Sequence, residues 1–108
     1  MLNTLIVIPT FNERENINPL LKSIFSQKIA VDVLILDDNS PDGTKKVVLE
    51  NKIKYKDRLH LINREKKQGL GKAYIEGFKW ALKKKYKKII QMDADLSHPP
   101  EKLIDIFN

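Results

Sequence analysis

The sequence predicts an α/β fold in which a mainly parallel sheet carries helices on both faces, and three observations support this prediction. Short apolar runs alternate with longer amphipathic segments along the chain, with no repeat, low-complexity tract or linker between them. The amphipathic segments are long enough to form helices that return the chain across a sheet, so successive strands should run parallel. A cluster of polar residues follows each apolar run, where strands of such a sheet would end.

Length and composition favour one compact domain, residues 1–108, with a sizeable core. Of its 108 residues, 42% are hydrophobic, which is enough for such a core. The absence of cysteine excludes disulfides and thiolate metal sites, and it fits a reducing compartment. A net charge of +6 favours anionic partners such as nucleotides, nucleic acid or acidic lipid surfaces. No apolar stretch approaches the roughly 20 residues of a membrane-spanning helix, and we expect no export signal.

Four apolar runs are the expected strands. They are "LNTLIVIPT" (2–10), "VDVLILDD" (31–38), "RLHLIN" (58–63) and "KKIIQMD" (87–93). The nearly continuous apolar stretch from Leu5 to Ile8 is typical of a strand that is buried on both faces. We therefore expect helices to cover both sides of the sheet.

The segments that follow these strands have helical spacing. After the first strand, apolar residues recur at this spacing from Ile17 to Phe25, with Asn12 as the expected N-cap and Glu15 three residues later. Further helices are expected over residues 44–55, from Gly71 onward, and from Pro99 to the end of the chain.

The densest basic segment, "KKKYKK", spans Lys83 to Lys88. We expect it to form the solvated last turn of a helix, where cations complement the helix dipole. A role in binding a membrane surface or phosphate is the alternative. Because it precedes the fourth strand, it should lie at the amino end of that strand.

The polar clusters after the four strands should meet at one edge of the sheet. They are "PTFNE" (9–13), "DDNSPDG" (37–43), "NREKKQGLGK" (63–72) and "DADLSH" (93–98). In parallel sheets, ligands bind outside the carboxyl ends of the strands. Four such clusters indicate a binding cleft rather than a chance surface.

The familiar nucleotide-binding motifs are absent from these clusters, but a pair of carboxylates stands in their place. No G-x-G-x-x-G opens the first helix, and "GLGKA" lacks the spacing of a P-loop. Asp93 and Asp95 flank one residue where the fourth strand ends, so the backbone can turn both toward one point. Carboxylates suit Mg²⁺ or Mn²⁺, and Mg²⁺ is commonly held by one or two of them together with substrate phosphates. An acidic first turn of a helix is the alternative explanation.

Four motifs together carry a resemblance to a known family. "VIPTFNERENI", "LDDNSPDGT", "QGLGKAYIEGF" and "MDADLSHPPE" occur in this order over essentially the whole chain. They resemble the N-terminal, donor-binding half of the polyprenol-phosphate (dolichol-phosphate) mannosyltransferases, which are inverting glycosyltransferases with a Rossmann-like, GT-A-type fold. The resemblance implies metal-dependent transfer of mannose from GDP-mannose to a polyprenyl phosphate, with inversion. Members of the family are roughly twice as long, so we expect the chain to be the N-terminal part of the catalytic domain.

The resemblance also implies a site made of three groups of residues. Pro9, Phe11 and Glu13 would form the nucleoside pocket, Leu36 and Asp38 would contact the base, and Asp93, Ala94 and Asp95 would meet the ribose, metal and diphosphate. Asp93 and Asp95 are the expected catalytic residues, and Ser97, where some relatives have Gln, would be a further metal ligand. Leu36 could equally be a core residue, and Asp38 could simply shape a turn with Asn39 and Ser40.

The expected partners are a nucleotide sugar, a polyprenyl phosphate and, through the remainder of a longer protein, a membrane surface at its cytoplasmic face. Two alternatives remain open. One is a related glycosyltransferase with another donor, such as UDP-glucose. The other is a non-catalytic module that binds anions or nucleic acid through the block Lys83 to Lys88. This alternative leaves the four strand-end motifs unexplained, so we expect no nucleic-acid partner.

Overall fold

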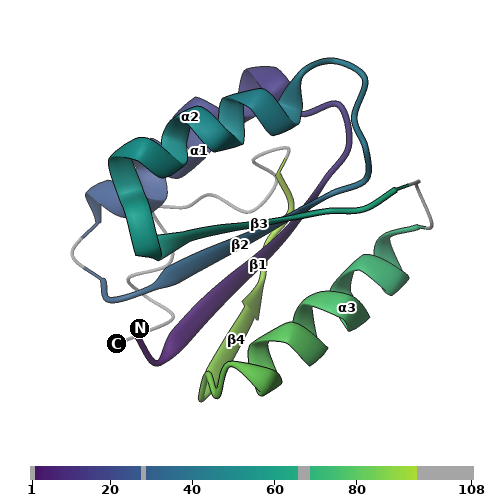
Figure 1. The fold of residues 1–108 in the computed structure, drawn as a ribbon. Coiled ribbons are helices and arrows are strands. Elements are labelled where there is room, and N and C mark those ends of the chain that lie inside the picture. Colours follow the sequence, from purple (N-terminus) through teal and green to yellow (C-terminus); the bar gives the residue numbers. More distant parts are fainter. Residues whose placement is uncertain (1, 28, 66–68, 95–108) are drawn as a thin grey trace.

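A parallel four-stranded sheet forms the centre of the molecule. The computed structural model describes residues 2–27, 29–65 and 69–94. Its strands are β1 (Thr4–Thr10), β2 (Asp32–Asp37), β3 (Leu59–Asn63) and β4 (Lys88–Gln91), in the order β3-β2-β1-β4 (Figure 1). All three strand pairs are parallel. The predicted parallel sheet is therefore confirmed, and each predicted strand forms within the range expected for it.

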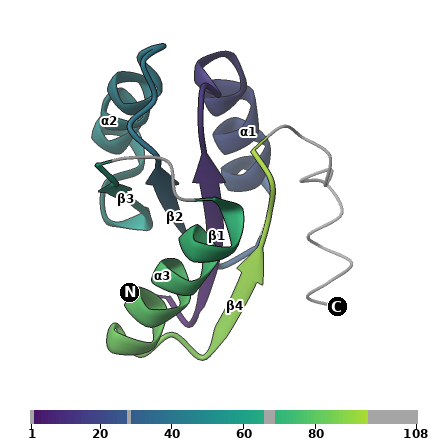
Figure 2. The same cartoon turned by 90° about the vertical axis from the view of Figure 1, so that its right-hand side faces the viewer.

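Helices cover both faces of this sheet. They are α1 (Arg14–Ser26), α2 (Thr44–Tyr55) and α3 (Leu70–Lys83), and a short 3₁₀ helix, η1 (Lys56–Arg58), leads into β3. Helices α1 and α2 lie side by side on one face, and α3 lies on the other (Figures 1 and 2). The two central strands, β1 and β2, are buried along their whole length because both of their faces are covered.

The side chains of these strands point alternately to the two faces of the sheet and contribute to two separate hydrophobic cores. On the α1 and α2 face, Ile6, Ile8, Val33 and Ile35 pack with apolar residues of both helices. On the α3 face, Leu5, Val7, Leu34 and Leu36 pack with α3 and with Tyr86. Successive residues of a strand point to opposite faces, which explains why such uniformly apolar runs were needed.

Helix α3 approaches the sheet closely at Gly77. A Cβ atom at this position would lie 2.5 Å from Val7 Cγ1 and 3.1 Å from Leu36 Cδ1. Separations below 3 Å are far inside normal van der Waals contact between carbon atoms. The absent side chain therefore allows α3 to pack directly on β1 and β2.

The expected start of the first helix is wrong in one respect. Asn12 does not cap α1: its φ is +55°, and the helix begins at Arg14 without a side-chain cap from its own segment. The backbone N–H groups of residues 12–14, where the chain enters α1, are instead bonded by the side chains of Ser40, Asp42 and Thr44, as described below. The helix predicted from Pro99 onward lies outside the described residues.

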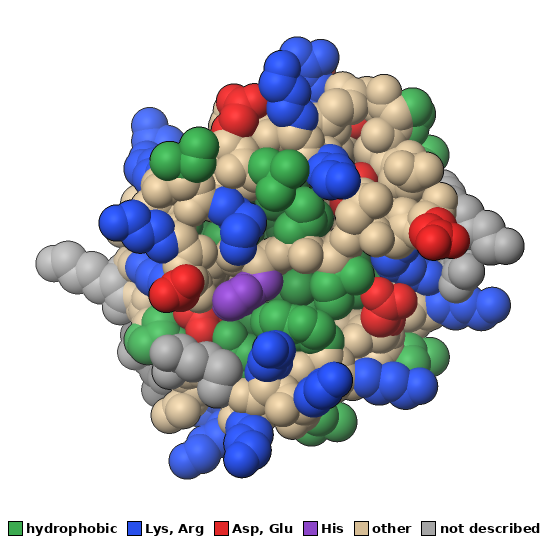
Figure 3. Space-filling view, in the orientation of Figure 1, with side chains coloured by type: hydrophobic (Ala, Val, Ile, Leu, Met, Phe, Trp, Pro, Cys, Tyr) green, Lys and Arg blue, Asp and Glu red, His purple; other side chains and the backbone are tan. Residues whose placement is uncertain are grey.

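The basic block Lys83 to Lys88 lies at the amino end of β4, as predicted. Its five lysines are exposed, and Tyr86 between them is buried and donates a 2.7 Å hydrogen bond to Asp32 Oδ2. Figure 3 shows lysine and arginine side chains spread over the visible face rather than gathered in one patch. In the part of the chain that the structure describes, no helix has the length and apolar character needed to cross a membrane.

Candidate functional site

The carboxyl ends of the strands bring the polar clusters to one edge of the sheet, which we call the carboxyl edge. The last residues of the three neighbouring strands β1, β2 and β3 lie in register, Thr10 beside Asp37 and Asp37 beside Asn63. On the other side of β1, the residue after β4, Met92, donates its N–H to Val7 O at 3.1 Å. The structure therefore places "PTFNE", "DDNSPDG" and the described parts of the other two clusters along this edge.

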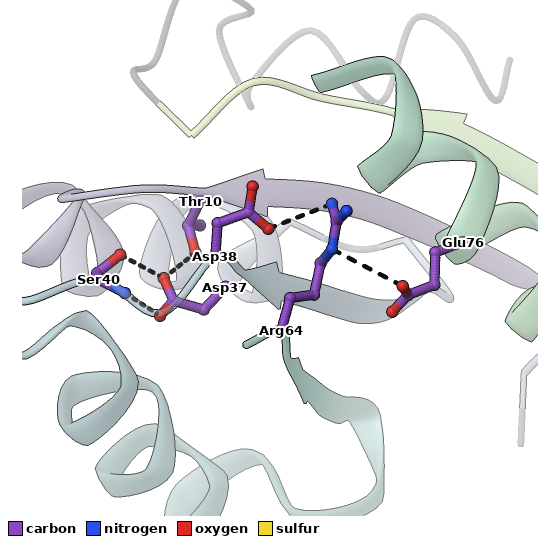
Figure 4. Close-up of polar contacts among 6 residues, drawn as sticks. All are labelled: Thr10, Asp37, Asp38, Ser40, Arg64 and Glu76. Carbon is purple, nitrogen blue, oxygen red and sulfur yellow. Dashed lines mark hydrogen bonds and ion pairs between the residues drawn. The ribbon is translucent and has the colours of Figure 1, made fainter. Parts of the chain in front are cut away.

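Asp37 organises the loop after β2. It is fully buried, and its Oδ1 accepts hydrogen bonds from the hydroxyls of Thr10 (2.7 Å) and Ser40 (2.6 Å). Its Oδ2 accepts the backbone N–H of Ser40 at 3.0 Å (Figure 4). Both carboxylate oxygens are thus used within the protein. The sequence analysis gave a turn of Asp38, Asn39 and Ser40 as the alternative to a base contact of Asp38, and it assigned no role to Asp37.

The same loop holds the N-terminus of α1. Ser40 Oγ accepts the N–H of Asn12 (2.8 Å), Thr44 Oγ1 that of Glu13 (3.1 Å), and Asp42 Oδ2 that of Arg14 (3.2 Å). Glu13 is the N-cap residue of α1 and Arg14 is its first residue, so two of these bonds satisfy N–H groups that a helix start leaves without intrahelical partners. They also fix the β1–α1 loop, which carries two of the predicted nucleoside residues, Phe11 and Glu13, against the β2–α2 loop.

The hydrogen bonds of Asp42 favour the ionised form of its carboxyl, which suits an acceptor at the start of α1. Burial acts to raise the pKa of its carboxyl, but the hydrogen bonds from the Thr44 hydroxyl and from the backbone N–H groups of Arg14 and Thr44 outweigh it. The pKa of Asp42 therefore lies below its usual value, because these donors favour the ionised form. An ionised carboxylate beside a helix N-terminus also interacts favourably with the helix dipole.

The residues predicted for the nucleoside pocket lie at or next to the end of β1. Pro9 is buried in the strand, Phe11 is half-buried just beyond it, and Glu13 accepts a 2.7 Å hydrogen bond from Asn16 Nδ2. Glu13 and its neighbours line a hollow of about 290 Å³ formed by residues 12–16 and Asp42. The carboxylate of Glu13 at this hollow suits ribose hydroxyls, and the half-buried ring of Phe11, which does not line the hollow, suits stacking on a base.

The two residues predicted to contact the base have different surroundings. Leu36 is fully buried in the core on the α3 side, so a contact with a base could come only from its backbone. Asp38 lies at the carboxyl edge with 7% of its surface exposed, and its N–H donates to Thr10 O at 3.0 Å. Its carboxylate faces the guanidinium of Arg64, with Oδ1 and Nη1 separated by 3.2 Å (Figure 4).

Arg64 also lies at the carboxyl edge, and the sequence analysis assigned it no role. It follows β3, is 7% exposed, and its Nε lies 3.7 Å from Glu76 Oε1 on α3. Its N–H donates to Asp37 O at 2.7 Å. The only signal in the sequence was an arginine at a strand end, and its burial depends on residues from two other elements.

Of the residues predicted to hold a metal, the structure describes Asp93. It lies after β4, and its Oδ1 accepts a 3.0 Å hydrogen bond from the Tyr74 hydroxyl on α3. Ala94, predicted beside it, is buried. Asp95 and Ser97 lie outside the described residues. Within residues 2–27, 29–65 and 69–94, no three His, Cys, Asp or Glu side chains are grouped closely enough to hold a metal, so the pairing of Asp93 with Asp95 stays a prediction.

Known proteins resemble this chain in both sequence and fold. It is 44% identical over 100 residues to a polyprenol monophosphomannose synthase of Mycolicibacterium smegmatis, covering 93% of this chain and 38% of that protein. It is 40% identical over 102 residues to an undecaprenyl-phosphate mannosyltransferase of Micrococcus luteus, covering 94% and 42%. The chain therefore spans less than half the length of these relatives.

A solved structure shares the fold. It is a mannosyltransferase from Pyrobaculum calidifontis, in complex with GDP-Man and Mn²⁺, and it matches with a TM-score of 0.71 at 21% identity over 87% of this chain and 28% of that one. At this identity the match concerns the fold alone, and it confirms the predicted GT-A-type architecture.

Fold and site together define an α/β domain whose polar residues gather at the carboxyl ends of the strands, which is the edge where open α/β sheets bind ligands. The model of glycosyl transferase family 2 matches residues 5–108. The chain belongs to this family.

Proposed function

We propose that the protein to which this chain belongs transfers mannose from GDP-mannose to the phosphate of a polyprenyl lipid, and that the chain supplies the donor half of the site. The observation that carries the proposal is the gathering of the strand-end clusters at one edge, in a chain 44% and 40% identical to two polyprenyl-phosphate mannosyltransferases. The protein would act at the cytoplasmic face of a membrane.

The described residues have the chemistry that a nucleoside requires. The ring of Phe11 offers a stacking surface, and the carboxylate of Glu13 can accept hydrogen bonds from ribose hydroxyls. Asp38 would accept N–H groups of the base. The hydrogen bonds that join the β1–α1 and β2–α2 loops would hold these groups in place before the nucleotide binds.

Asp93 fits a divalent metal, because its carboxylate supplies hard oxygen ligands and is oriented by the Tyr74 hydroxyl. Asp93 and Asp95 would hold Mg²⁺ or Mn²⁺, with Ser97 as a further predicted ligand. When bound, the metal would neutralise the charge of the leaving diphosphate as a Lewis acid. An adjacent donor to a ligating carboxylate is a common means of fixing its orientation.

The chemistry needs little help from a protein base. A phosphate monoester has a second pKa of about 6, so a lipid phosphate is largely anionic at neutral pH and can itself attack the sugar. Attack opposite the leaving diphosphate inverts the anomeric centre. The task of these residues is therefore to bind, orient and keep water away from the donor.

Calorimetric titration of the 108-residue chain with GDP and UDP, with Mn²⁺ and with chelator, tests the donor assignment. We expect tighter binding of GDP than of UDP, and a further gain with Mn²⁺ that the change Asp95→Asn largely removes. Equal GDP affinities with metal and with chelator would contradict the metal assignment. Tighter binding of UDP would favour the alternative donor, and binding that ignores metal but weakens steeply with salt would favour a general anion-binding module.

A transfer assay tests the reaction. Radiolabelled mannose from GDP-mannose should appear in an organic-extractable lipid when the chain carries its natural C-terminal continuation. The 108-residue chain should bind the nucleotide without transferring mannose, because catalysis requires both reactants held about 3 to 3.5 Å apart. Transfer by neither protein, with GDP binding intact, would count against this acceptor or this sugar.

A further inference from the structure

The outer face of α3 carries exposed apolar side chains. Ala73, Gly77 and Ala81 recur at every fourth position and are buried, so the positions between them face away from the sheet. Ile75 and Leu82 lie on this outer side, with 54% and 66% of their surface exposed. A single exposed aliphatic side chain is ordinary. These two lie about two turns apart on the same side of one helix, which makes them a feature of α3 as a whole.

Lysines surround these two side chains. Lys72, Lys79 and Lys83 lie on the same outer side and are exposed, and Lys84 and Lys85 follow at the end of the helix. Where α3 lies in Figure 1, Figure 3 shows lysine or arginine side chains beside apolar ones. An anionic lipid surface suits such a face, because its headgroups attract the ammonium groups and its interface takes up aliphatic side chains.

The positive charge of α3 is not opposed by exposed acid. The helix contains one acidic residue, Glu76, whose Oε1 lies 3.7 Å from Arg64 Nε, so its charge is compensated within the protein. Helix α2, on the opposite face of the sheet, also has an exposed isoleucine, Ile53, but the exposed carboxylate of Glu50 lies one turn before it. Of the two helices, α3 is therefore the one whose exposed face is complementary to an anionic surface.

This face begins beside the predicted metal site. Tyr74, next to Ile75 near the start of α3, donates its hydroxyl to Asp93 Oδ1 at 3.0 Å. The acceptor in the proposed function is a lipid phosphate, which must reach the donor at this edge of the sheet. A lipid surface along α3 would bring lipid phosphates to this edge on the side of Asp93, whereas a surface along α2 would lie beyond the sheet (Figure 2).

We propose that the outer face of α3, formed by Lys72, Ile75, Lys79, Leu82 and Lys83, docks this chain on the surface of a membrane that contains anionic lipids. The choice of a lipid surface as the partner rests on the proposed function, whose acceptor is a lipid phosphate. The inference goes beyond that function, because it assigns membrane contact to the donor half itself rather than to the remainder of a longer protein.

A fluorescent label on each helix tests where lipid makes contact. The chain contains no cysteine, so one introduced thiol can be labelled selectively. An environment-sensitive dye on Ile75→Cys should shift to shorter wavelength with vesicles that contain phosphatidylglycerol, and much less with vesicles of phosphatidylcholine alone. Ile53→Cys is the matched control, because Ile53 is an exposed isoleucine on the other face of the sheet. Its label should not shift with either kind of vesicle.

Co-sedimentation with the anionic vesicles tests the role of charge. The double variant Lys79→Gln with Lys83→Gln should bind them about tenfold or more weakly, because each lysine near such a surface contributes about fivefold. The double variant Lys46→Gln with Lys54→Gln removes the same charge from α2. It should bind within about twofold of the wild-type chain, because α2 lies beyond the sheet and salt screens such charges over about 10 Å at 0.1 M.

The longer protein shows whether lipid or protein covers α3. With the natural C-terminal continuation attached, the label on Ile75→Cys should again shift when anionic vesicles are added. A label that is shielded before vesicles are added would show that the continuation covers this face, and would overturn the proposal. An RNA oligonucleotide that binds the chain as tightly as the vesicles do, with no shift of the label by vesicles, would overturn it in favour of general anion binding.

The remaining outcomes separate this proposal from the proposed function. Equal losses in the two double lysine variants, or equal shifts of the labels on α2 and α3, would overturn docking through α3. A wild-type chain that binds GDP but no vesicles would overturn the docking alone. A chain that binds the vesicles through α3 but binds no GDP would refute the proposed function and retain the docking face. Circular dichroism confirms that each variant folds, since all of the changed side chains are exposed.

Discussion

A single threonine hydroxyl connects the two loops that border the predicted nucleoside pocket. Thr44 is fully buried, accepts the N–H of Glu13 at 3.1 Å and donates to Asp42 Oδ1. Its backbone N–H also donates to Asp42, at 3.0 Å. The residue therefore serves α2, which it begins, and α1, whose first turn it helps to cap.

Replacing Thr44 with Val should lower the free energy of unfolding by about 1 to 2 kcal/mol, because the part-buried N–H group of Glu13, the N-cap residue of α1, loses its acceptor. Urea denaturation would measure the change. Ser26→Ala is the control: the Ser26 hydroxyl is exposed and bonds within its own helix, so its loss should cost less than about 0.5 kcal/mol. Equal effects of the two changes would argue against the capping role.

At the scale of elements, local sequence patterns sufficed to predict the helices and strands that the structure describes, but not the contacts that connect them. The apolar run at Leu5 to Ile8 and the helical spacing after it depend on neighbouring residues, which a sequence displays directly. The capping of α1 depends instead on distant residues, because the acceptors of its N–H groups lie 28 to 31 positions further along the chain. The prediction of Asn12 as the N-cap considered only neighbouring residues and was wrong. Arg64 was missed for the same reason, since its burial requires the β2–β3 register and α3.

Helix α3 offers a matched pair of glycines for testing its packing. Gly77→Ala should lower the free energy of unfolding by about 3 kcal/mol, because the new methyl group would meet Val7 at 2.5 Å and push the helix off the sheet. Gly71→Ala lies in the same helix with no atom within 4 Å of its new Cβ, so it should be neutral or stabilise by about 0.5 kcal/mol. Urea denaturation of both variants measures the difference, and similar losses would contradict the close approach at Gly77.

Across the whole molecule, the two edges of the sheet have different tasks. The carboxyl edge collects the polar groups that the proposed function uses. At the amino edge, the chain stabilises itself: Asp32 Oδ2 accepts hydrogen bonds from the Leu2 N–H (3.1 Å) and the Tyr86 hydroxyl (2.7 Å). This division follows from parallel strands, since every strand then enters at one edge and leaves at the other.

Tyr86 allows the amino edge to be tested by itself. Burial, the hydrogen bond to Asp32 and the charge of Asp32 raise the pKa of the Tyr86 phenol above its ordinary value. A phenol whose pKa is raised by folding stabilises the folded chain fully below the unfolded pKa of about 10, and this contribution is lost as the pH rises beyond it. Stability of the wild-type chain should therefore fall above about pH 10.

Tyr86→Phe removes the phenol, so the variant should lack the part of the fall in stability that ionisation of Tyr86 causes. The variant should be less stable than the wild-type chain by about 2 kcal/mol at pH 7, since Asp32 loses a hydrogen bond, and the difference should shrink as the pH rises above about 10. Urea denaturation at several pH values measures both effects. GDP affinity at neutral pH is the control and should not change, because Tyr86 lies at the opposite edge from the proposed site. A difference in stability that stays constant up to pH 11 would show that the phenol does not contribute through its proton.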